Sequence, residues 1–118
     1  MVDGTQDPSP VLNITHSYST AISNGFVGTN SGEVYISDSY NTGVIRSGAS
    51  MIGTNYKKAI IDNVYNSGSV QNGAGIISSN LGTAIISNSY NTGSISVKSY
   101  RETSTGGLVG DSDGNTTI

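Results

Sequence analysis

The chain has 118 residues and a formal net charge of −3, and Gly, Ser, Thr and Asn together supply 60 of the residues. It has no cysteine, one histidine and five basic residues, which argues against a disulfide framework, a thiolate or multi-histidine metal site, and a nucleic-acid surface. Strong helix formers are scarce and no run of about 20 apolar residues occurs, so we expect neither a helical bundle nor membrane insertion by this segment.

A tandem repeat organises almost the whole chain. The opening segment 1–10 matches nothing else and holds both prolines, so we interpret it as a tail. From residue 25 onward a unit of 25 residues recurs without a gap, whereas the partial copy before it is three residues shorter; the third copy is lengthened by an insertion at about 96–105. An insertion into a repeat maps to a loop on one face. The predicted boundaries are 11–24 (partial), 25–49, 50–74, 75–105 and 106–118 (partial).

Each unit contains three short stretches that favour β-structure. In the first copy they are 25–29, 33–40 and 43–47, and Asn- and Gly-containing turn signals separate them. Three strands in a 25-residue repeat predict one coil of a parallel β-solenoid, with coils stacked about 4.8 Å apart. We therefore expect an all-β, right-handed parallel β-solenoid of about four coils.

Apolar residues recur at equivalent positions of the repeat and predict the core. The clearest columns contain Ile36/Ile61/Ile86, Val34/Ala59/Ala84 and Ile45/Val70/Ile95. Two neighbouring columns are both apolar at positions 26 and 27, and again at positions 35 and 36, so the sequence leaves open which member of each pair faces inward.

Aromatic and amide columns are the candidate functional residues. Tyr18, Tyr40, Tyr65 and Tyr90 align, and so do Asn41, Asn66 and Asn91. We favour structural ladders for both, because stacked rings and stacked amides stabilise adjacent coils. The alternative is a surface that binds sugar rings or a protein. In the inserted loop, Tyr100 and Arg101 are candidate partner contacts.

The two partial copies suggest a second use of the fold. Residues 12–14 begin in the column where Ile118 stops, so the last strand of one copy could pair with the first strand of another. Such β-augmentation would build a head-to-tail filament. The candidate end-stacking residues are Leu12, Ile14, Leu108 and Ile118.

The repeat resembles the GLUG-motif repeats of bacterial adhesins and other cell-surface proteins. GGLVG stands intact at 106–110, and a degenerate copy, GFVGTN, occupies 25–30. The second half of the motif appears as DSYNTGVI, NVYNSGSV and NSYNTGSI at 38–45, 63–70 and 88–95. The resemblance implies a secreted or surface-anchored bacterial protein whose repeats form a stalk or a binding surface, and it supplies no catalytic residue.

From these patterns we expect a non-enzymatic structural or adhesive module, located outside the cell or on the bacterial surface, without a metal or other cofactor. Its expected partner is a protein or glycan on a host or neighbouring cell. The alternatives are a self-assembling filament subunit and a glycan-binding module.

Overall fold

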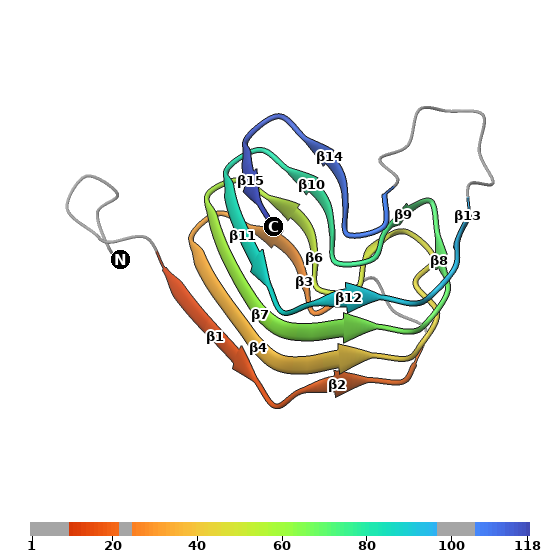
Figure 1. Cartoon of the computed structure of the whole chain (residues 1–118). Coiled ribbons are helices and arrows are strands. Elements are labelled where there is room, and N and C mark those ends of the chain that lie inside the picture. The colour runs from red at the N-terminus through yellow and green to blue at the C-terminus, as the bar shows by residue number, and fades with distance from the viewer. Residues whose placement is uncertain (1–9, 22–24, 97–105) are drawn as a thin grey trace.

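The computed structural model describes residues 10–21, 25–96 and 106–118 and shows an all-β parallel solenoid (Figure 1). This confirms the predicted fold class. The described residues form about three turns rather than four, because the copies at the two ends contribute only part of a coil each. No helix in the described part of the chain is long and apolar enough to cross a membrane.

The strands stack into sheets that run along the solenoid axis, and all the strand pairs are parallel (Figure 1). The first sheet has the order β1 (Val11–Thr15), β4 (Glu33–Asn41), β7 (Lys58–Asn66), β11 (Thr83–Ser87) and β15 (Asn115–Thr117), with β2 (Tyr18–Ser19) on β4 and β12 (Tyr90–Asn91) on β7. The second has the order β14 (Val109–Ser112), β10 (Ile77–Asn80), β6 (Ile52–Asn55) and β3 (Val27–Asn30). Two short pairs complete the coil: β13 (Ile95–Ser96) with β8 (Val70–Gln71), and β5 (Gly48–Ala49) with β9 (Gly73–Ala74).

The register follows the sequence period. Ile36 pairs with Ile61, and Ile61 pairs with Ile86, so equivalent residues lie directly above one another. The same alignment holds across the shorter first turn, where Tyr18 pairs with Tyr40. Because the strands pair in parallel and in register, a residue type that recurs at one position of the repeat forms a ladder of stacked side chains along the solenoid.

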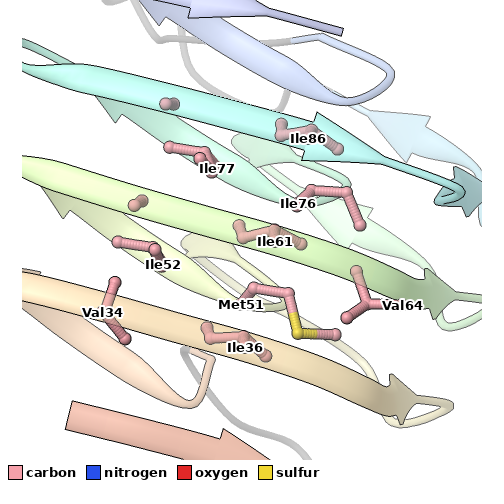
Figure 2. Packing of buried hydrophobic residues seen from close by; sticks show 11 residues of the cluster. Val34, Ile36, Met51, Ile52, Ile61, Val64, Ile76, Ile77 and Ile86 are labelled. Carbon is pink, nitrogen blue, oxygen red and sulfur yellow. The ribbon is translucent and has the colours of Figure 1, made fainter.

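The core is a narrow column between the first and second sheets, filled from both sides by aliphatic side chains (Figure 2). Ile36, Ile61 and Ile86 are buried, whereas Ile85 is 39% exposed. Column 36 therefore faces inward and column 35 faces outward, as alternation along an extended strand requires.

Positions 26 and 27 do not compete for the interior, because both columns are buried in the two central copies and half-buried in the copies at the ends. Met51 and Ile52 are inaccessible to solvent, and so are Ile76 and Ile77 (Figure 2). The chain bends just before β6 and β10 begin, and alternation applies only within an extended strand. Two consecutive side chains can therefore enter the core at this corner.

A column of left-handed residues divides the first sheet into two arms. The first arm contains β1, β11, β15 and the parts of β4 and β7 before this column, and the second arm contains β2, β12 and the parts of β4 and β7 after it. At the same position of four successive turns, the φ angle is positive for a residue that is not glycine. Asn and Asp tolerate this conformation better than other side chains, which explains their presence at the corner. The residues are His16 (φ 51°), Asp38 (51°), Asn63 (54°) and Asn88 (50°).

Candidate functional site

The four aligned tyrosines form one continuous aromatic stack on the second arm of the first sheet. The ring centroids of Tyr18 and Tyr40 lie 5.4 Å apart, those of Tyr40 and Tyr65 5.0 Å, and those of Tyr65 and Tyr90 5.1 Å. The planes of neighbouring rings differ by 12° at most. Strands β2, β4, β7 and β12 carry the rings in register, so the predicted aromatic ladder is present. Each stacked pair contributes about 0.5–1.5 kcal/mol beyond the area that it buries.

The stacking limits how this ladder can contact a sugar. Tyr18 is 64% exposed and Tyr90 is 52% exposed, while Tyr40 and Tyr65 are half-buried between their neighbours. A sugar ring packs on the face of an aromatic ring, and both faces of the two central rings are covered by other tyrosines. We call the outward face of the second arm, which carries the four tyrosines, the outer wall. Along this wall the ladder therefore offers ring edges and phenol hydroxyls to a partner.

The aligned asparagines Asn41, Asn66 and Asn91 form an inner ladder, because they follow the outward tyrosines by one residue. Asn41 Nδ2 donates to Asn66 Oδ1 at 2.7 Å, and Asn66 Nδ2 donates to Asn91 Oδ1 at 2.7 Å. Asn41 and Asn66 are buried and Asn91 is half-buried. Their amides stabilise the wall from within, so the structural interpretation fits their position better than partner contact does.

A second amide ladder lies at the turn between the two main sheets. Asn30 Nδ2 donates to Asn55 Oδ1 at 2.7 Å, and Asn55 Nδ2 donates to Asn80 Oδ1 at 2.8 Å. The same nitrogens reach a backbone carbonyl of the next coil, that of Lys58 for Asn30 and that of Thr83 for Asn55. Each asparagine thus holds a turn and joins it to the next coil.

Both ladders have a direction, because each amide nitrogen donates toward the C-terminal end of the solenoid. No amide of a preceding turn therefore donates a hydrogen bond to the side-chain oxygen of the first member of the inner ladder, Asn41. Asn41 Oδ1 is buried and accepts no hydrogen bond from the described residues, and the residue paired with Asn41 in the preceding turn is Ser19. We did not predict this unpartnered atom, although the serine in a column of asparagines signals it.

Polar side chains also cluster on the solvent-facing side of the corner that the left-handed residues form. Asp62 Oδ1 accepts hydrogen bonds from Asn88 Nδ2 at 2.7 Å and from Ser87 Oγ at 2.8 Å. These two hydrogen bonds lower the pKa of the Asp62 carboxyl below its ordinary value, and the bond from Asn88 has the larger effect. His16 Nε2 lies 3.9 Å from Asp38 Oδ2 in an exposed pair. Among the described residues, no group of three or more His, Asp or Glu side chains is arranged to hold a metal ion.

The remaining candidates lie near the ends of the solenoid or outside the described residues. Leu12 pairs with Val34, and Ile14 pairs with Ile36, so both lie in core columns. Leu12 is 48% exposed and Ile118 is 73% exposed, whereas Leu108 is half-buried and packs against the core. The predicted loop contacts Tyr100 and Arg101 lie outside the described residues.

Comparison with known proteins does not place the chain in a family: no family model, no curated protein and no solved structure matches it. Function is therefore inferred from the geometry of the ladders and of the outer wall.

Proposed function

We propose that the chain is a structural and adhesive repeat module of a secreted or surface-displayed bacterial protein. The observation that carries the proposal is the set of ladders that tie each coil to the next: two of amides and one of four stacked rings. Together with the continuous parallel backbone pairing, these ladders fix each coil against its neighbours, so that the stacked coils present one extended surface to a partner. The resemblance to GLUG-motif repeats supports a position outside the cell.

The outer wall beside the tyrosine ladder is the surface that we assign to a partner. Thr42, Ser67 and Thr92 form an exposed hydroxyl column two residues from the tyrosines. Phenol and aliphatic hydroxyls in parallel rows both donate and accept hydrogen bonds, so they suit a polar, uncharged partner such as a glycan or a glycosylated surface protein. We therefore place the partner across several coils rather than in a pocket.

A binding assay tests this assignment. Fluorescently labelled chain would be applied to a printed glycan array and to cultured epithelial cells. The double variant Tyr40→Phe/Tyr65→Phe preserves ring stacking and removes two hydroxyls, so we expect weaker binding with an unchanged melting temperature. Tyr35→Phe removes a hydroxyl from the first arm and is the matched control. Equal binding by all three proteins would contradict the assigned surface.

End-to-end association is a second candidate function, and the edge strands favour it. β1 and β15 lie at opposite edges of the first sheet in the same columns, since Val11 pairs with Glu33 and Asn115 pairs with Thr83. Parallel pairing of β15 with β1 of a second copy would put Ile118 opposite Ile14 and cover exposed apolar side chains.

Light scattering across a wide concentration range tests the second candidate. Leu12→Lys places a charge on the β1 edge and should reduce the mass of concentration-dependent species to that of one chain. Leu81→Lys is the control, because Leu81 is also exposed but lies at a turn on the side of the solenoid. If the two variants associate equally, edge pairing is wrong.

A further inference from the structure

The tyrosine ladder brings oxidisable side chains from four successive turns into direct contact. The chain has no cysteine, so no disulfide bond links one coil to another. The phenols of Tyr18, Tyr40, Tyr65 and Tyr90 instead stack with centroids 5.0–5.4 Å apart. Neighbouring rings belong to different turns, so a bond between two of them would join those turns covalently.

We infer that the tyrosine ladder is a site of oxidative cross-linking, where a peroxidase with hydrogen peroxide joins stacked rings of neighbouring coils as dityrosine. This goes beyond the proposed structural and adhesive function and does not depend on which partner the wall binds. The chemistry needs a one-electron oxidant and two phenols held close together, and the ladder provides the phenols.

Coupling of two stacked tyrosines removes two electrons and two protons from the protein. Each phenol loses one electron and its hydroxyl proton and becomes a phenoxyl radical. The two radicals form one carbon–carbon bond between the ring carbons next to the oxygens. Each of these carbons then gives up its hydrogen as a proton, and each oxygen regains one, so both rings become aromatic phenols again. In total, two hydrogens leave the protein for each bond, and one hydrogen peroxide is reduced to two waters.

The exposed fractions predict which rings are joined. The rings are stacked face over face, so one of each pair must swing before the two carbons can meet. Tyr18 and Tyr90 are more than half exposed and have a tyrosine on one face, whereas Tyr40 and Tyr65 have a tyrosine on each face. We therefore assign the two cross-links to Tyr18–Tyr40 and Tyr65–Tyr90, each of which contains one ring that can turn.

The cross-links would fasten the solenoid at both ends of the ladder. Tyr18–Tyr40 joins β2 to β4, and Tyr65–Tyr90 joins β7 to β12. β2 and β12 are two-residue strands, and each pairs with one strand in the first sheet. A covalent bond at these places would hold the short strands against the longer ones, which suits a module that must resist pulling forces outside the cell.

Digestion with trypsin shows which tyrosines have been cross-linked. Cleavage after Arg46, Lys57, Lys58 and Lys98 releases peptides 1–46, 47–57 and 59–98. The first contains Tyr18 and Tyr40 and the last contains Tyr65 and Tyr90, so each predicted cross-link is a loop within one peptide. A Tyr40–Tyr65 bond would instead connect two peptides, and Tyr56 in peptide 47–57 is an internal control.

The experiment uses the whole chain at low micromolar concentration, treated with a peroxidase and limiting hydrogen peroxide. Dityrosine fluorescence, denaturing gels and peptide masses are then recorded for the chain and for two variants. We expect a monomer in which peptides 1–46 and 59–98 each lose two hydrogens. Tyr18→Phe keeps the ring but cannot form a phenoxyl radical, so peptide 1–46 should keep its mass while 59–98 still changes. Tyr56→Phe should behave like the unaltered chain.

Three results would overturn the inference. One is oxidation of tyrosine without any loop-linked peptide. Another is a link in peptide 1–46 that persists in Tyr18→Phe, because it would then involve Tyr35. The third is the same pattern after treatment in strong denaturant, which would show that the stack plays no part.

Discussion

Removal of the central amide of the inner ladder gives a direct test of the forces that hold the coils together. Asn66 is fully buried, and its side chain takes part in three hydrogen bonds: from Asn41 Nδ2, to Asn91 Oδ1 and to the Gly68 carbonyl, at 2.7–2.8 Å. Asn66→Ala removes all three and leaves the buried carbonyl of Gly68 without this donor. At about 1 kcal/mol for each buried hydrogen bond, we expect a loss of about 3 kcal/mol in the free energy of unfolding.

Urea unfolding followed by circular dichroism measures this loss. With a slope of about 1.5 kcal/mol per molar urea, the midpoint should fall by about 2 M. The neighbouring residue supplies the control, because Ser67 is exposed and Ser67→Ala should change stability by less than about 0.5 kcal/mol. A loss below about 1 kcal/mol for Asn66→Ala, or one equal to that of the control, would refute the claim that the amide ladder stabilises the stack.

The direction of the amide ladder, the close approach of the coils and the hydrogen bonds to Asp62 each predict the effect of one substitution. Ser19→Asn places an amide donor before the buried, unpartnered Asn41 Oδ1 and should raise the free energy of unfolding by about 1 kcal/mol; an unchanged urea midpoint would contradict the ladder direction. Gly68→Ala puts a Cβ against a backbone carbonyl of the preceding coil, so we expect a loss of about 3 kcal/mol or more in thermal unfolding, and a loss under about 1 kcal/mol would show that the coils can separate locally. The pKa of Asp62 is lowered chiefly by Asn88, so their interaction stabilises the fold above the ordinary aspartate pKa and is lost as the pH falls through the lowered value. In Asn88→Gly the backbone can still adopt the left-handed conformation, but the hydrogen bond to Asp62 is lost, so the Asp62 pKa measured by NMR titration should rise. An unchanged pKa would show that Asn88 does not lower it.

The repeat made much of the fold predictable. A constant period of 25 residues over three copies requires a structure in which equivalent residues have equivalent neighbours, and parallel stacking of coils satisfies this requirement. The pairing of Tyr40 with Tyr65 and of Asn41 with Asn66 follows from that period alone. The ladders were accessible from sequence for the same reason, because a column of one residue type is visible in the alignment of the copies.

The candidate site was only partly predictable, because the repeat pattern does not show which of its columns are exposed to solvent. Asn41 and Tyr40 are neighbours with the same repeat behaviour, yet the asparagine is buried and the tyrosine lies in the outer wall. The vacant acceptor on Asn41 also depends on the direction in which the amides donate, and the order of the letters does not contain that direction.

The sequence by itself determined the all-β solenoid, the register of its coils and the identity of its ladders, since all three follow from the 25-residue period. Only the tertiary structure decided which columns enter the core at a corner. Ile36 faces inward and Tyr35 outward by simple alternation, but Met51 and Ile52 both enter the core because the backbone bends between one sheet and the next. Side-chain direction at such a bend depends on backbone angles that the assembled coil imposes, and the pattern of apolar residues does not encode them separately.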